Sequence, residues 1–278
     1  MTTPPPAMTI IEQTTIGKRS QATNEDGIHA DSRFVAVVDG STSKTPIRID
    51  PKMTNGQCCM HIVKEVIAQM PADISCEDFC QQVTRQIHDT YLAHGFDIQQ
   101  LKDHPEQRTT ASCVVYSERR KEVWMIGDCQ CLIDGVLHGD PKPQEEYYAE
   151  KRAAFLRRQL AEGHAISEFQ QHDPGRDLIV PAIIESCRYQ NVLFSVFDGF
   201  PVSMPHVSIV SCPESKEIVL ASDGYPFLMP TLQESEERLA DLLRDDPLCI
   251  SIYKASKGLM RGNRSFDDRS YVRFTVAS

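Results

Sequence analysis

The chain has 278 residues, of which 41% are hydrophobic, enough to build a sizeable core in one large domain or two small ones. Its formal net charge is -10, so the composition gives no sign of the basic face that nucleic-acid binders usually carry. No apolar run approaches the ~20 residues that a membrane-spanning helix requires. We therefore expect a soluble protein that binds neither nucleic acid nor membrane.

The beginning of the chain, residues 1–8, is rich in Pro and Thr and is predicted to be a flexible tail. It lacks the basic and apolar regions of a signal peptide. The ten cysteines show no C-x-x-C pairs typical of zinc sites, so we interpret them as reduced thiols of a cytoplasmic protein. Regular segments run almost to the C-terminus, which favours one domain over residues 9–278.

In the first half of the chain, hydrophobic periodicity and capping signals predict two strands followed by two helices. The predicted elements are a strand over 8–16, a loop over 17–27, a buried strand over 34–38 ending at Asp39-Gly40, a helix around 59–70, and a helix that opens at Ser75-x-x-Asp78 and ends before Gly95.

In the second half, strands return before further helices. The predicted elements are a meander of strands over 109–116, 122–126, 130–133 and 136–138 with a hairpin turn at Asp134-Gly135, a helix over 144–160, a polar loop over 167–182, a strand over 218–221, a helix capped by Thr231-x-x-Glu234, a helix near 248–260, and a strand over 270–276. The basic pairs Lys151-Arg152 and Arg157-Arg158 are interpreted as a solvated helix face. Helix pairs between blocks of strands predict helices packed on antiparallel sheets.

Acidic residues stand beside apolar strands at four places that are far apart in the sequence. These are Asn24-Glu25-Asp26, Asp39-Gly40, Asp223-Gly224 and Asp267-Asp268. Strand ends can bring distant carboxylates together, and hard cations such as Mg²⁺ and Mn²⁺ bind carboxylate and carbonyl oxygens. The pattern is therefore compatible with an oxygen-ligand metal site.

Each of these motifs alone has a simpler interpretation, because Asp-Gly is a common turn. The chain has four such dipeptides, and we interpret those at Asp134 and Asp198 as turns. The other two, at Asp39 and Asp223, gain their significance only from their order and context.

That order resembles the PP2C (PPM) family of metal-dependent phosphatases over about residues 10–276. The motifs that carry the resemblance are, in sequence order, Arg19, Asn24-Glu25-Asp26, Val37-Val38-Asp39-Gly40, Thr109-Thr110-Ala111, Gly127-Asp128-Cys129, Ala221-Ser222-Asp223-Gly224 and Asp267-Asp268-Arg269-Ser270. Each motif is weak alone, whereas seven in the same order are a specific signal.

The resemblance implies an α/β fold, a four-layer sandwich with two central antiparallel β-sheets flanked by α-helices. It also implies the hydrolysis of phosphoserine or phosphothreonine in proteins, by water activated between two divalent cations, Mg²⁺ or Mn²⁺. The partner would be a phosphorylated protein substrate. A bridging cation pair lowers the pKa of water toward about 7, so no covalent nucleophile is needed.

Position by position, the resemblance implies a role for eight residues. Asp39 would bridge two metal ions and the Gly40 carbonyl would bind one of them, Asp223 and Asp267 would complete the second ion's shell, Glu25 and Asp26 would hold metal-bound waters with Asp26 orienting the nucleophile, Asp128 would serve a third, weaker ion, and Arg19 would hold the substrate phosphate.

The sequence departs from the family pattern in two places that bear on activity. Asp39-Gly40 is followed by Ser41-Thr42 where family members often have His or Met, so the general acid is unassigned. Arg19 stands seven residues before Asp26, whereas the family's arginine is usually closer. Two alternatives therefore remain: a non-catalytic regulatory or binding module of the same fold, and a metal phosphohydrolase acting on a small molecule.

Overall fold

The computed structural model describes residues 8–139, 142 and 144–277. Residues 1–7 of the predicted tail lie outside the described residues, and Met8 already belongs to the first strand. The strands are β1 (Met8–Ile16), β2 (Asp26–Ala30), β3 (Phe34–Gly40), β4 (Ala111–Ser117), β5 (Glu122–Ile126), β6 (Gln130–Ile133), β7 (Val136–Gly139), β8 (Ser208–Ser211), β9 (Glu217–Ala221) and β10 (Arg269–Val276). The helices are α1 (Asn55–Gln69), α2 (Cys76–Ala93), α3 (Ile98–Asp103), α4 (Glu145–Ala161), α5 (Ile166–Phe169), α6 (Pro174–Ser186) and α7 (Leu232–Asp245).

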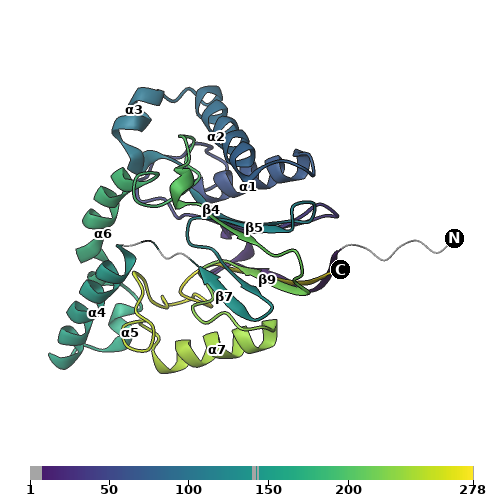
Figure 1. Ribbon diagram of the computed structural model, residues 1–278. Helices are drawn as coiled ribbons and strands as arrows, with labels where there is room; N and C mark the ends of the chain where they lie inside the picture. Colours follow the sequence, from purple (N-terminus) through teal and green to yellow (C-terminus); the bar gives the residue numbers. More distant parts are fainter. Residues whose placement is uncertain (1–7, 140–141, 143, 278) are drawn as a thin grey trace.

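The strands form two five-stranded antiparallel sheets that pack face to face. One has the order β1-β10-β9-β6-β7 and the other β2-β3-β4-β5-β8. Helices α1 and α2 cover the outer face of the second sheet, and α7 covers the outer face of the first (Figure 1). The four-layer sandwich with two central antiparallel sheets is thus confirmed.

Strand β3 shows why the sequence has a continuous apolar run instead of an alternating one. Val35 and Val37 lie in the core between the two sheets, whereas Phe34, Ala36 and Val38 pack with the helices on the other face. A strand that is buried on both faces needs apolar residues at every position. The prediction of a buried strand at 34–38 is confirmed.

The predicted helix starts at Ser75 and Thr231 are also confirmed, because local hydrogen bonds determine them. The Ser75 hydroxyl accepts the backbone N–H of Asp78 at 3.0 Å, and Thr231 forms a full capping box with Glu234. These bonds satisfy backbone N–H groups that have no partner within the first helical turn. Gly95 follows α2 with φ +75°, as expected of a helix terminator.

The predicted meander over residues 109–138 is wrong. β4 pairs with β5 in one sheet, whereas β6 pairs with β7 and β9 in the other. The chain crosses between the sheets at Gly127-Asp128-Cys129, where Gly127 has φ +84°. Local patterns identified each strand, but the choice of sheet depends on contacts with distant strands. This crossing places Asp128 at the end of the sandwich.

The polar loop predicted over 167–182 is also wrong, because α5 and α6 occupy most of it. Asp173 caps α6 by accepting the backbone N–H of Arg176 at 2.9 Å, and Pro174 takes the first helical position, where its missing N–H costs nothing. Pro181 lies inside this helix, although proline is unfavourable in a helix interior.

Three smaller differences concern segments whose structure depends on distant contacts. The segment 248–260, predicted as a helix, is irregular, and strands β2 and β8 lie where no strand was predicted. Arg152, expected on a solvated face, is fully buried and pairs with Asp173 at 2.7 Å. None of the helices in the described ranges combines the length and apolar character that a membrane crossing requires.

The antiparallel pairing determines where the acidic motifs meet. Asp26 begins β2 directly opposite Asp39 near the end of β3. Asp223 follows β9 and Asp267 precedes β10, its antiparallel neighbour, so both lie at the same sheet edge. In Figure 1, α4 and α6 stand beyond this end of the sandwich, opposite the end at which both termini lie.

Candidate functional site

A cleft of about 420 Å³ opens between this end of the sandwich and the pair α4 and α6. Its lining includes Asp39 and Gly40 from β3, Asp128 from the crossing between the sheets, and Asp223 and Asp267 from the edges of β9 and β10. A pocket of this size is typical of ligand sites. Five of the eight predicted site residues therefore line one cavity.

The pKa values of three carboxylates, those of Asp26, Asp39 and Asp223, are raised by burial and by neighbouring carboxylates. Burial raises the pKa of Asp26 well above its usual range, and the carboxylates of Asp267, Asp268 and Asp223 raise it further despite a hydrogen bond from Ser222. The pKa of Asp39 is raised well above its usual range by burial and then by Asp26 and Asp223. Burial, followed by Asp267 and Asp128, raises the pKa of Asp223 to about 6. We call these three residues the uncompensated carboxylates.

A local contact holds the Asp26 carboxylate in place. The Ser222 hydroxyl donates to Asp26 Oδ2 at 2.6 Å and accepts the backbone N–H of Ser270 at 2.8 Å, which ties β2 to the edge of the other sheet. Asp26 is 4% exposed, and its Oδ1 has no hydrogen-bond partner among the described residues. A buried oxygen without a partner is costly in a folded protein, so its presence points to a ligand.

Two other carboxylates, those of Asp267 and Asp128, are paired with lysines. Lys257 and Lys18 both contact Asp267, the latter at 3.2 Å. Burial alone would raise the pKa of Asp267, but the two ammonium groups lower it to about 2. Lys142 lies 2.5 Å from Asp128 and, together with a hydrogen bond from Ser112, lowers the pKa of Asp128 against the effect of burial. We call these two the lysine-paired carboxylates.

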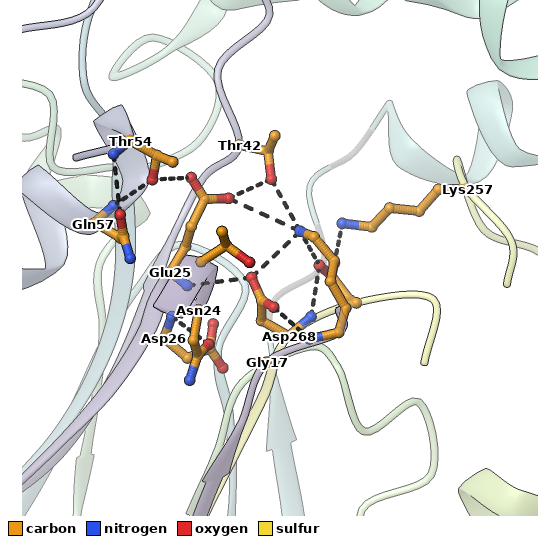
Figure 2. Close-up of polar contacts among 12 residues, drawn as sticks. Gly17, Asn24, Glu25, Asp26, Thr42, Thr54, Gln57, Lys257 and Asp268 are labelled. Atoms are coloured by element: carbon orange, nitrogen blue, oxygen red, sulfur yellow. Dashed lines mark hydrogen bonds and ion pairs between the residues drawn. The ribbon is translucent and has the colours of Figure 1, made fainter. Parts of the chain in front are cut away.

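Glu25 and Asp268 are engaged in the framework around the cleft (Figure 2). Glu25 accepts the hydroxyls of Thr42 at 2.5 Å and Thr54 at 2.6 Å, and Thr54 caps α1. Asp268 accepts the backbone N–H groups of Lys18 at 2.7 Å and Glu25 at 3.3 Å. Thr42, which belongs to the Ser41-Thr42 departure from the family pattern, thus positions Glu25.

Gly40 lies where two backbones approach closely. A Cβ at this position would stand 2.2 Å from the Gly56 carbonyl oxygen and 2.7 Å from that of Glu25. Any side chain would therefore push the start of α1 away from β3. The glycine keeps the end of β3 and the first turn of α1 together at the edge of the cleft.

Three predicted site residues do not line the cleft: Glu25 and Asp26 are buried beside it, whereas Arg19 lies outside it. Arg19 is exposed on the loop after β1 and is absent from the lining. The preceding residue, Lys18, points inward instead and lies within 4 Å of Asp267, Asp268 and Glu25. The motif identified the right loop, and the two neighbouring side chains leave it in different directions.

In kind, the donor set fits a hard divalent cation. The site offers carboxylate oxygens, including the partnerless Oδ1 of Asp26, and carboxylates this close together are stabilised by added positive charge. The arrangement is not preassembled, since no three Asp, Glu, His or Cys side chains of the described chain converge closely enough to hold one ion. Lysine ammonium groups supply part of the positive charge instead.

Sequence reasoning missed the cationic residues of the cleft. Lys44, Lys142, Arg176 and Lys257 line the cleft from separate segments, and Lys18 beside the cleft meets Asp267 across 249 positions of the sequence. No local spacing links such pairs.

No protein-family model and no curated protein matches the chain. Among solved structures, the chain is similar to the Ser/Thr phosphatase PstP/Ppp of Mycobacterium tuberculosis (16% identity, 98% of this chain and 99% of that chain covered, TM-score 0.47). It is also similar to the Ser/Thr phosphatase Stp1 of Staphylococcus aureus (13%, 97% and 96%, TM-score 0.46) and to the PPM Ser-Thr phosphatase MsPP of Mycobacterium smegmatis (15%, 96% and 97%, TM-score 0.47). These structures belong to the family that the sequence motifs resemble. The assignment of site residues in this chain therefore rests on its own geometry.

Proposed function

We propose that the chain is a protein phosphatase that hydrolyses phosphoserine and phosphothreonine with the help of Mg²⁺ or Mn²⁺. The observation that carries the proposal is the convergence of acidic motifs from both sheets on one cleft. Asp39, Asp128, Asp223 and Asp267 line it, and Asp26 lies directly opposite Asp39 in the β2–β3 ladder. Basic side chains on the walls complement a phosphoryl group.

In this proposal, Asp39, the Gly40 carbonyl, Asp223 and Asp267 hold the two principal cations. When bound, such cations make water nucleophilic at neutral pH and offset the charge of the phosphoryl group. Asp128 would bind a third ion more weakly, and this ion would replace the contact of Asp128 with Lys142. The role of Asp39 is supported by the carboxylates around it, which favour added positive charge at this position.

The remaining residues position groups around the cations. Asp26 holds and orients the attacking water through its partnerless Oδ1, while Ser222 fixes the other carboxylate oxygen. Glu25 accepts from a second ordered water, and its carboxylate is held by Thr42 and Thr54. Both residues thereby keep protons and solvent in a fixed geometry next to the reacting phosphate.

Two neighbouring residues compete for the role of holding the substrate phosphate. The motif order assigns it to Arg19, and the inward direction of Lys18 supports Lys18 instead. If Arg19 moves over the bound substrate, Arg19→Ala should raise the KM for a phosphothreonine peptide. If Lys18 keeps its inward direction when the substrate binds, Lys18→Met should raise this KM instead. An unchanged KM for Arg19→Ala would remove the arginine from the site.

The experiment that tests the function is an assay with p-nitrophenyl phosphate and a phosphothreonine peptide, each with and without Mn²⁺. We expect hydrolysis that EDTA abolishes and that Mn²⁺ or Mg²⁺ restores. A panel of small phosphomonoesters in the same assay separates a protein phosphatase from a small-molecule phosphohydrolase. Activity that survives EDTA would contradict the metal-dependent mechanism.

A specific observation favours a second candidate, a non-catalytic binding module of the same fold. Lys18 and Lys257 already neutralise Asp267, and Lys142 neutralises Asp128, so the charge that cations would supply is partly provided by the chain. Calorimetric titration with Mn²⁺ distinguishes the two. A phosphatase should bind at least two ions, whereas the module should bind fewer or none.

A further inference from the structure

Several positive side chains line the cleft, and not all of them pair with its carboxylates. Four of them influence one another. They are Lys44 from the loop after β3, Lys142 ahead of α4, Arg176 in α6 and Lys257 from the segment between α7 and β10. The four come from four different segments, so the fold itself brings these charges together.

These four cations divide into an inner pair and an outer pair. The inner pair, Lys142 and Lys257, contacts the lysine-paired carboxylates Asp128 and Asp267. In the outer pair, Lys44 donates to the Thr42 carbonyl, and Arg176 donates to the Ser256 carbonyl at 2.7 Å and its hydroxyl at 3.3 Å. Neither Lys44 nor Arg176 forms an ion pair with an acidic side chain of residues 8–139, 142 or 144–277.

The electrostatic environment of Lys44 shows the consequence of this arrangement. Burial lowers the pKa of Lys44 to about 8, and the positive charges of Lys257, Arg176 and Lys142 contribute to the decrease. Burial likewise lowers the pKa of Arg176. Lys44 and Arg176 are half-buried, and two half-buried cations that line one cleft without forming an ion pair favour an anion from outside the chain.

The acidic side chains near the outer pair are already engaged with other cations. Asp267 and Asp173 both act on Arg176, but Asp267 is contacted by Lys18 and Lys257, and Asp173 is paired with Arg152. Glu145 lies 3.8 Å from Lys142 and is thus associated with the inner pair. Lys254 is paired with Glu150, on the α4 side of the cleft. The strongest charged neighbours of Lys44 other than a cysteine are cations.

We propose that Lys44 and Arg176 form a second anion-binding subsite, beside the carboxylate floor, that takes a negatively charged group of the substrate other than the phosphoryl group to be hydrolysed. The inference rests on the proposed function and adds the substrate class to it. The substrate is a protein segment in which the phosphorylated residue is adjacent to an acidic side chain or to a second phosphorylated residue.

The dimensions of the cleft support a substrate of this kind. A volume of about 420 Å³ falls in the range of pockets that enclose ligands far larger than a phosphoryl group. The outer pair lies on opposing walls, with Lys44 on the sandwich side and Arg176 on α6. A group between them would be fixed from both sides, and Arg176 offers a planar fork suited to carboxylate or phosphate oxygens.

The test compares three phosphothreonine peptides that differ only in the residue next to the phosphothreonine, which is Gln, Glu or phosphoserine. Equilibrium binding is measured by fluorescence anisotropy in the presence of Mn²⁺, with a phosphonate analogue of phosphothreonine that is not hydrolysed. We expect the wild-type protein to bind the Glu or phosphoserine peptide about tenfold more tightly than the Gln peptide, as for one favourable charge contact. The better of the two identifies the natural group.

Variants then assign the preference to the two residues. Lys44→Met and Arg176→Met should each remove the preference for the acidic peptides, whereas Lys44→Arg should retain it because it keeps the charge. Lys52→Met, a change at an exposed lysine of the same loop region, is the matched control and should leave all three affinities unchanged. Thermal unfolding of each variant verifies that it is folded.

Two outcomes would overturn the subsite: equal wild-type affinity for all three peptides, or a preference that survives both Met variants. The proposed function fails separately. If no phosphate ester is hydrolysed but the preference exists and depends on Lys44, the subsite stands and the phosphatase activity does not. If p-nitrophenyl phosphate is hydrolysed with Mn²⁺ and no preference exists, only the subsite is wrong.

Discussion

The uncompensated carboxylates and the lysine-paired carboxylates are the same chemical group at the same end of one sandwich, yet their pKa values shift in opposite directions. The pKa of Asp39 is raised well above its usual range by burial and by neighbouring carboxylates. The pKa of Asp267 is lowered to about 2, because Lys257 and Lys18 outweigh the effect of burial. The difference comes from the partners that the fold supplies, since all these residues lie at or next to strand ends.

The comparison shows that a cluster of aspartates does not have one electrostatic character. A lysine can provide locally what a divalent cation would provide, and it does so at Asp267 and Asp128 but not at Asp26 or Asp39. The uncompensated group is therefore the part of the site that gains most from a cation. In the lysine-paired group, a bound cation would have to replace a lysine ammonium group that already neutralises the carboxylate.

The largest effect expected from this comparison is the loss of turnover in Asp39→Asn. An amide supplies less charge to a hard cation. Changes at residues that only orient the metal ligands cost about 10–100-fold, so we expect a change at a ligand itself to lower kcat by more than about 100-fold. The assay is Mn²⁺-dependent hydrolysis of a phosphothreonine peptide.

Asp134→Asn is the matched control for this prediction, because Asp134 is also followed by glycine. It stands at the β6–β7 turn with φ +46°, and its Oδ1 accepts the N–H groups of Lys216 and Glu217 at 3.0 Å. Asn tolerates this conformation and keeps the same acceptor, so activity should not change. Equal losses in the two variants would remove Asp39 from the site.

The next effect separates two adjacent residues, Asp267 and Asp268. Asp267→Asn should weaken Mn²⁺ binding by about 10–100-fold, since its carboxylate lines the cleft. Asp268→Asn should change it by less than about threefold, because Asp268 accepts backbone N–H groups that an amide oxygen can also accept in part. Calorimetric titration of both variants provides the measurement, and the reverse order of effects would place the ligand at Asp268.

Sequence patterns predicted the strand ends that carry these aspartates, because the information is local. An apolar run followed by Asp39-Gly40 identifies β3, and Thr231-x-x-Glu234 identifies the start of α7. Local patterns failed where distant contacts decide. The crossing at Asp128 depends on which sheet accepts β6, and α6 depends on a cap and a proline that also occur in loops.

The same reason explains which parts of the site could be predicted. The order of the acidic motifs pointed to one end of the fold, and the antiparallel pairing of β9 with β10 brings two of them to the same edge. The cations of the cleft could not be predicted in this way. No local pattern indicates that Lys18 contacts a carboxylate 249 positions away. Likewise, no local pattern shows that Lys18 points inward while its neighbour Arg19 is exposed.

A third prediction concerns stability without metal and has opposite signs for the two groups. In EDTA at pH 8, Asp39→Asn should raise the melting temperature by a few degrees, because it removes a charge that neighbouring carboxylates repel. Asp267→Asn should lower it by a similar amount, because Lys18 and Lys257 lose their shared partner. Thermal unfolding followed by circular dichroism measures both, and shifts of the same sign would show that the two groups do not differ.

The smallest expected effect tests whether Lys257 competes with a cation for Asp267. Lys257 occupies Asp267 Oδ2, so Lys257→Met should free this oxygen and strengthen Mn²⁺ binding about threefold, a modest gain because the ammonium group is partly exposed and screened. Lys254→Met is the matched control, since Lys254 lies on the same segment but pairs with Glu150. Its Mn²⁺ affinity should equal that of the wild type. If Lys257→Met instead binds Mn²⁺ more weakly, then Lys257 supports the metal-loaded site, and its contact with Asp267 positions the carboxylate for the cation instead of competing with it.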